Sequence, residues 1–192
     1  MKPKSLIFGK GFICERLTQE FAAVVTERMI LQLSDAQEEY DKYKPEIIIN
    51  CIGYTGKRNV DDCELDKEVT LTANSFVPVL LAEVALRNKI KLIHISSGCI
   101  YHYDYKKSKP ITEDEVPYFF GLFYSRSKIY SERALEVLGK TYNILICRIR
   151  IPLDDRPSPK NIINKLINYR KVIDVPNSVT YIPDFVEALR HL

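Results

Sequence analysis

The most constraining feature of this 192-residue sequence is a series of short apolar runs that are continuous rather than alternating. A strand without polar alternation is covered on both faces, which is the usual situation in a parallel sheet flanked by helices. The runs occupy residues 5–9, 46–53, 91–97 and 143–149, with a weaker one at 22–25. Helical spacing marks residues 12–21, 34–43, 68–88 and 124–138. The alternation of strand and helix predicts an α/β fold with a doubly wound, mostly parallel sheet.

The C-terminal part of the sequence is less regular than the rest. Three prolines, Pro152, Pro157 and Pro159, follow the last long apolar run and interrupt regular structure. Beyond them the pattern predicts a helix over residues 161–169, a strand over 172–175 and a helix over 184–192.

Composition and charge argue against several classes of partner. Lys+Arg 28 and Asp+Glu 25 leave a net charge of +3, which gives no reason to expect a nucleic acid or a membrane surface as partner. No run approaches the roughly 18 apolar residues of a membrane span, and the first apolar run is too short for a signal sequence. We therefore expect a cytoplasmic protein. The five cysteines lack CxxC or His/Cys ligand spacing, which predicts free thiols and no metal site.

A glycine turn between the first strand and the first helix is the first candidate site. Gly9-Lys10-Gly11-Phe12-Ile13 lies where backbone N–H groups hold the pyrophosphate of a dinucleotide in a Rossmann-type domain. Cys14 replaces the third glycine of that fingerprint, and a plain tight turn is the alternative interpretation. Glu27 and Arg28 then stand where an acid would take the ribose 2′-hydroxyl of NADH, or an arginine the 2′-phosphate of NADPH. The choice of cofactor stays open.

A serine, a tyrosine and a lysine form the second candidate site. Ser97 ends an apolar strand, and the carboxyl ends of such strands open onto the ligand crevice. Tyr124 and Lys128 are four residues apart and lie on one face of a predicted helix. A nearby ammonium lowers the pKa of a phenol, so this pair suits proton transfer to a carbonyl that Ser97 holds while hydride arrives at carbon. A solvated helix face is the alternative.

Six stretches of the chain resemble the extended short-chain dehydrogenase/reductase superfamily. Within it they are most similar to the branch of dTDP-4-dehydrorhamnose reductase and the UDP-rhamnose-forming epimerase/reductases of plants and giant viruses. The stretches are residues 6–13, 55–64, 97–101, 119–128, 148–152 and 173–180. The resemblance implies reduction of a nucleotide-linked 4-keto-6-deoxyhexose with NADPH or NADH, after 3,5-epimerisation.

The resemblance also implies roles for individual residues. It makes Ser97, Tyr124 and Lys128 the reductase triad, and it places Gly9, Gly11, Gly53 and Asn74 near the cofactor. Cys99 has the spacing of the epimerisation cysteine that follows the catalytic serine in the related GDP-fucose synthase. Lys165 is the second candidate acid/base, by resemblance to a lysine of the plant enzymes. The alternatives are a small buried apolar residue for Cys99 and a surface charge for Lys165.

The same resemblance divides the chain into two regions. We expect a dinucleotide-binding domain over residues 1–150 and a partial substrate-binding region over 151–192, because relatives continue with another strand and helix. A homodimer is a further expectation. Two other functions stay open: 4-keto reduction without epimerisation, and a non-catalytic nucleotide-binding subunit like the dehydrogenase-related regulatory subunit of methionine adenosyltransferase.

Overall fold

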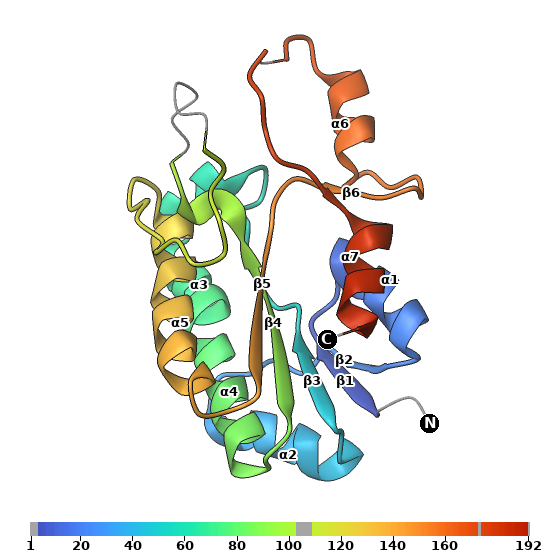
Figure 1. The fold of residues 1–192 in the computed structure, drawn as a ribbon, viewed down its shortest axis with the longest axis vertical. Helices are drawn as coiled ribbons and strands as arrows, with labels where there is room; N and C mark the ends of the chain where they lie inside the picture. Colours follow the sequence, from blue (N-terminus) through green and yellow to red (C-terminus); the bar gives the residue numbers. More distant parts are fainter. Residues whose placement is uncertain (1–3, 103–108, 173, 192) are drawn as a thin grey trace.

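A computed structural model describes residues 4–102, 109–172 and 174–191 and has a parallel five-stranded sheet at its centre (Figure 1). The strands are β1 (Ser5–Phe8), β2 (Val24–Thr26), β3 (Ile47–Asn50), β4 (Lys91–Ser97) and β5 (Ile144–Ile149), in the order β2-β1-β3-β4-β5. All four pairings are parallel. The order reverses between β1 and β3, as in doubly wound sheets, and ligands bind such sheets at this reversal. The predicted α/β fold is confirmed.

Helices cover both faces of this sheet. On one face lie α1 (Phe12–Phe21) and α7 (Ile182–Arg190), and on the other α2 (Leu33–Tyr43), α4 (Val77–Arg87) and α5 (Phe123–Gly139) (Figure 1). Successive residues of β1 show why the apolar runs are continuous. Leu6 and Phe8 enter the core under α2, α4 and α5, whereas Ile7 enters the core under α1 and α7. Each strand therefore needs apolar side chains in both directions.

Shorter elements connect this framework. They are η1 (Val60–Glu64), α3 (Lys67–Leu71), η2 (Thr72–Phe76), η3 (Gly98–Ile100), β6 (Pro152–Leu153), α6 (Ile162–Asn168) and β7 (Thr180–Tyr181). The predicted helix over 68–88 is thus α3, a π-helical turn η2 and α4 in continuous succession. This helical segment, Lys67–Arg87, is long and apolar enough to cross a membrane, but half of its most apolar stretch is buried inside the fold. That burial is typical of a core helix.

Two sequence predictions differ from the structure. The strand predicted over 172–175 is not formed by its described residues, and Ile173 lies outside them. The short parallel pair β6–β7 forms instead, because Thr180 and Tyr181 have Pro152 and Leu153 as partners. The second strand begins at Val24, later than predicted, since Ala22 ends α1 in the left-handed region with φ 49° and donates its N–H to Thr18. The end of the predicted helix at Leu192 also lies outside the described residues.

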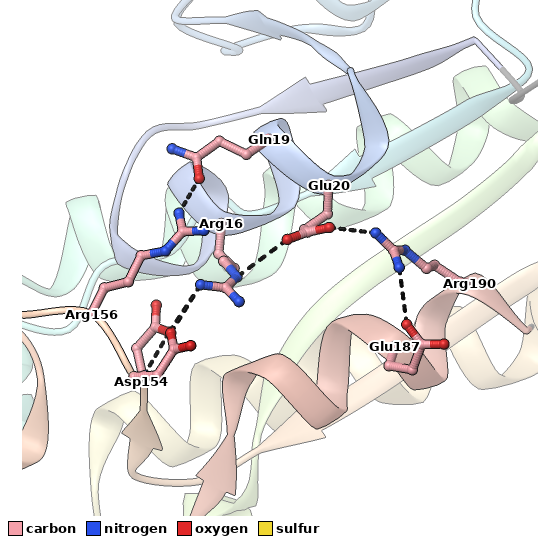
Figure 2. Close-up of polar contacts among 8 residues, drawn as sticks. Arg16, Gln19, Glu20, Asp154, Arg156, Glu187 and Arg190 are labelled. Carbon is pink, nitrogen blue, oxygen red and sulfur yellow. Dashed lines mark hydrogen bonds and ion pairs between the residues drawn. The ribbon is translucent and has the colours of Figure 1, made fainter.

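Polar contacts hold the C-terminal region against helix α1 (Figure 2). The buried Arg16 guanidinium lies 3.4 Å from Asp154 and 3.0 Å from Asp155, in the loop after β6. One turn further along the same face of α1, Glu20 pairs with both Arg16 and Arg190 of α7. Helix α7 also packs three apolar residues into the core beside α1, namely Ile182, Val186 and Leu189. The boundary at residue 150 stays a prediction, but α7 contributes to the core of the sheet.

Candidate functional site

The site is built where β1, β3 and β4 end, at the reversal of strand order. Gly9 follows β1 with φ +98°, and a Cβ there would come within 3.0 Å of the Ile52 backbone nitrogen. Glycine is therefore required by both conformation and space. The chain then turns at Gly11 into α1, whose first N–H groups have no partners within the helix. Phe12 and Ile13 supply backbone to that first turn, while their side chains pack against the core.

Cys14 occupies the position of the missing glycine in the first turn of α1. Its thiol donates to the Gly9 carbonyl oxygen at 2.9 Å and lies beside Cys51, which follows β3. The hydrogen bond with Cys51 is the main reason why the pKa of Cys14 falls to about 7, against the opposing effect of burial. All five cysteines are free, and the described residues hold no group of three or more metal-ligating side chains.

Arg28, the candidate ligand for a 2′-phosphate, lies two residues beyond β2. Its guanidinium is held by carboxylates of α2, at 2.7 Å from Glu38 and 3.1 Å from Asp35. These hydrogen bonds, first that to Glu38, raise the pKa of Arg28. Glu27 in turn pairs with Lys10 of the glycine turn. The structure thus keeps both the acid and the arginine near the turn, each already engaged with a protein partner.

Ser97 and Tyr124 are brought together as the sequence predicted. Ser97 ends β4, Tyr124 lies in the first turn of α5, and their buried side chains lie close enough for Ser97 to affect the phenol. The predicted lowering of the tyrosine pKa is wrong for this structure. Burial raises the pKa of Tyr124 to about 12, and the neighbouring Ser97 hydroxyl opposes it. The phenol is therefore protonated at neutral pH, which is the state that a proton donor needs.

Lys128 lies one turn further along α5, and its ammonium group is buried. Burial lowers the pKa of Lys128 from 10.5 to about 8, and the negative charge of Glu132 acts to raise it. Its Nζ donates to the Ile95 carbonyl oxygen at 3.3 Å rather than to Tyr124, which explains why it does not stabilise the phenolate. A Cβ on Gly53 would lie 3.3 Å from this Nζ, so Gly53 leaves the space in which the ammonium sits.

Asn74 fixes the wall of the site beside Lys128. The fully buried amide of this residue accepts from the Tyr54 N–H at 2.8 Å and donates to the Tyr54 carbonyl oxygen at 2.9 Å. It also donates to Ser127 Oγ of α5 at 3.1 Å. Asn74 lies in the π-helical turn η2, a local irregularity that is frequent at functional sites. The amide thereby ties the segment after β3 to the helix that carries Tyr124 and Lys128.

Cys99 is half-buried beside a cation that the sequence reasoning missed. The Arg150 guanidinium donates to the Gly98 carbonyl oxygen at 3.2 Å and lies 3.7 Å from Cys99 Sγ. Arg150 is in turn held by Asn177 Oδ1 at 2.6 Å. All three of Cys99, Arg150 and Asn177 line a cavity of about 1110 Å³. Lys165 lies elsewhere, exposed on α6, with no hydrogen bond or ion pair from its side chain to the described residues.

A signal for Arg150 was present in the sequence. It belongs to the stretch 148–152, which carried the family resemblance without an assigned role. The next residue, Ile151, has φ +38°, an outlier for a β-branched side chain. Such strain persists where surrounding contacts enforce it, often at functional sites. Here the backbone of Arg150 is fixed on both sides by Thr180, at 2.9 Å from its N–H and 2.7 Å from its carbonyl oxygen.

Comparisons with known proteins identify relatives of this chain. The chain is 32% identical over 198 residues to the Arabidopsis thaliana trifunctional UDP-glucose 4,6-dehydratase/UDP-4-keto-6-deoxy-D-glucose 3,5-epimerase/UDP-4-keto-L-rhamnose-reductase RHM2. That alignment covers 95% of this chain but 29% of the plant protein, so the chain spans less than a third of its length.

Two solved structures have the same fold. The L780 UDP-rhamnose synthase of Acanthamoeba polyphaga mimivirus superposes with a TM-score of 0.90 at 26% identity, over 100% of this chain and 71% of that one. The dTDP-4-dehydrorhamnose reductase of Bacillus anthracis, solved in complex with NADP, gives 0.80 at 21% identity, over 100% and 70%. A family model described as RmlD substrate binding domain matches residues 9–175, and the chain therefore belongs to that family.

Proposed function

We propose that this chain reduces the 4-keto group of a nucleotide-linked 6-deoxyhexose with NADPH, and that it first epimerises the sugar through Cys99. The observation that carries the reductive part is that the buried side chains of Ser97 and Tyr124 meet, with the Lys128 ammonium one helical turn away. The names of the relatives support the same substrate class, since they include UDP-rhamnose synthase and dTDP-4-dehydrorhamnose reductase.

The residues at the glycine turn fit a dinucleotide. Gly9 and Gly11 leave the N–H groups of the first turn of α1 open to a pyrophosphate, and the helix dipole favours that anion. Gly53 leaves room beside Lys128, where a Cβ would intrude. When bound, the reduced nicotinamide supplies hydride to the carbonyl carbon. NADPH is preferred in this proposal because the Bacillus anthracis reductase was solved with NADP and because Arg28 follows β2, where a Rossmann fold binds the adenosine ribose.

In the reduction, Ser97 and Tyr124 act on the carbonyl oxygen. The Ser97 hydroxyl holds the oxygen, and the Tyr124 phenol, protonated at neutral pH, gives it a proton as negative charge develops there. The buried Lys128 ammonium places positive charge behind this pair and can hold a ribose hydroxyl of the dinucleotide. Water has little access, because all three side chains are buried.

In the epimerisation, Cys99 removes a proton from a carbon beside the ketone as its thiolate. The electron pair of the broken C–H bond moves into an enolate, and a proton then returns to the opposite face of that carbon. Arg150 places a guanidinium 3.7 Å from the sulfur, where it can donate a hydrogen bond to Cys99 Sγ. The backbone around Cys99 is also fixed, since its N–H donates to Ser97 Oγ and its carbonyl oxygen accepts from Ser125 Oγ. Lys165, which lies on α6 outside the cavity that Cys99 lines, stays the candidate for the returning acid from its resemblance to the plant enzymes.

Two measurements separate the parts of this proposal. With NADPH and UDP- or dTDP-4-keto-6-deoxyglucose, the protein should consume cofactor and form a rhamnose nucleotide, and Tyr124→Phe should lower turnover by roughly 10²-fold or more. Without NADPH, deuterium from the solvent should enter C3 and C5 of the sugar, and Cys99→Ala should abolish that exchange. Reduction of a pre-epimerised sugar without any exchange would leave a 4-reductase. Cofactor binding without turnover would favour a nucleotide-binding subunit instead.

The remaining expectations on partners are also proposals. We propose a cytoplasmic homodimer without nucleic-acid or membrane partners. Sedimentation of the purified protein at several concentrations tests the dimer.

A further inference from the structure

We propose that Lys160, from the C-terminal region of the chain, binds the pyrophosphate of the dinucleotide together with the glycine turn. This inference rests on the proposed function, because it assumes that the turn holds a dinucleotide. No residue of the region after β5 was assigned to the cofactor by the sequence. The observation that starts the argument is a distance: a Cβ built on Gly11 would lie 3.9 Å from Lys160 Nζ.

Lys160 reaches the turn because the loop that carries it is fixed to helix α1. Arg16 of α1 pairs with Asp154 and Asp155 at the start of this loop, and Gln19 accepts from Arg156 (Figure 2). These contacts come from the same helix whose N-terminus faces the predicted pyrophosphate site.

Within the loop, a buried asparagine holds the backbone next to Lys160. The Asn161 amide donates to the carbonyl oxygens of Asp154 at 2.7 Å and Arg156 at 3.0 Å. The Lys160 N–H donates to Ser158 Oγ at 3.3 Å. The backbone at Lys160 is therefore fixed, and only the exposed side chain has to be ordered when the ammonium binds an anion.

The charges around the turn point to an anionic ligand. Lys10, which lies in the glycine turn itself, forms an ion pair with Glu27. Lys160 has no ion pair or side-chain hydrogen bond within the described part of the chain. Its ammonium thus lies next to the positive end of the α1 dipole without a carboxylate partner, an arrangement that an anion between them would stabilise. Of the groups in a nicotinamide dinucleotide, the pyrophosphate is the anion that a Rossmann turn binds at this point.

Lys160 is also suited to link the two halves of the site. It precedes α6, and the segment after α6 carries Asn177, which lines the cavity next to Cys99. A cofactor held by both the glycine turn and Lys160 would restrain this segment. Cofactor binding would then also order the part of the cavity next to Cys99, where the sugar is proposed to bind.

Three ligands and three variants test the proposal. ADP-ribose carries the pyrophosphate but no 2′-phosphate, whereas 2′-AMP carries the 2′-phosphate but no pyrophosphate. We expect Lys160→Met to weaken ADP-ribose and NADPH binding about tenfold, as for loss of one charge-assisted hydrogen bond, and to leave 2′-AMP unchanged. Lys160→Arg should retain most of the affinity. Lys171→Met, which removes another exposed lysine of the region, is the matched control.

Calorimetric titration at several salt concentrations gives the readout. The slope of log Kd against log salt for ADP-ribose should become shallower in Lys160→Met, since one fewer cation contacts the phosphates. An unchanged ADP-ribose affinity in Lys160→Met overturns the proposal, and so does an equal loss of 2′-AMP affinity, because the effect would then be general. If the wild-type protein binds neither ADP-ribose nor NADPH, the proposed function itself fails, and this inference with it.

Discussion

Replacing the buried lysine of the triad should make the protein more stable while removing activity. Folding lowers the pKa of Lys128 from 10.5 to about 8, so at neutral pH a charge is kept in a site that disfavours it. The unfolded chain binds more protons at this residue between pH 8 and 10.5, and stability therefore rises with pH through that window. The shift corresponds to a cost of about 3 kcal/mol at pH 7, and about 2 kcal/mol at pH 9.

Lys128→Met keeps the length of the side chain and removes the charge. It also removes the 3.3 Å hydrogen bond to the Ile95 carbonyl oxygen, a loss of about 1 kcal/mol. The expected net gain in unfolding free energy is about 2 kcal/mol at pH 7, falling to about 1 kcal/mol at pH 9. Reductase turnover should be lost at every pH.

Guanidinium chloride unfolding at pH 6.5, 7.5, 8.5 and 9.5 measures this difference against the wild type, with Lys171→Met as the exposed-lysine control. Each pair of curves is compared at a single pH, so the titration of other groups cancels. A Lys128→Met variant that is less stable than the wild type at pH 7, or a difference that does not shrink towards pH 9.5, would refute the reasoning. The first result would mean that the ammonium is well solvated by its surroundings, and the second that it does not titrate in this range.

Three further substitutions probe other parts of the structure. Asn74→Ala removes three buried hydrogen bonds and should lower the unfolding free energy by about 3 kcal/mol, seen as a lower midpoint in urea; a loss below about 1 kcal/mol contradicts the geometry. Arg148→Met leaves the carboxylate of Glu132 buried without its 2.8 Å partner and should cost about 3 kcal/mol at pH 8, with recovery when Glu132→Gln is added. Ala22→Gly should raise the melting temperature, because glycine adopts φ 49° without strain and the gain is up to about 1 kcal/mol; an unchanged or lower value argues against strain there.

Much of the framework could be predicted because its signals are local. The continuous run at 46–53 indicates a strand covered on both faces, and Ile48 and Ile49 of β3 do enter opposite cores. The spacing of Tyr124 and Lys128 places both on one face of a helix without any knowledge of the fold. The strand predicted over 172–175 is not formed by its described residues, since a strand needs a partner and Thr180–Tyr181 pairs with β6 instead.

The contacts that complete the site join residues that are far apart in the sequence. Arg150 is 51 residues from Cys99 in sequence, and they meet because β4 and β5 pair with Ser97 opposite Ile149. In that register Gly98 and Arg150, the residues that follow the two strands, lie beside each other, and Cys99 is the next residue along the chain. The contact between Arg150 and Cys99 therefore follows once β4 and β5 are known to be adjacent. The sequence alone does not specify that adjacency. The predicted effect of Lys128 on Tyr124 failed for a related reason, since the ammonium of Lys128 in α5 points to the carbonyl oxygen of Ile95 in β4.

Cys14 gives the glycine turn a property that the usual glycine lacks. Its pKa of about 7 means that the first turn of α1 changes charge near neutral pH, directly beneath the position proposed for a pyrophosphate. A thiolate there repels the phosphates, so the affinity for ADP-ribose should decline as the pH rises from 6 to 8, and Cys14→Gly should flatten that profile. The fingerprint position that departs from the family pattern would then make dinucleotide affinity depend on pH in a range where a glycine at the same position would not.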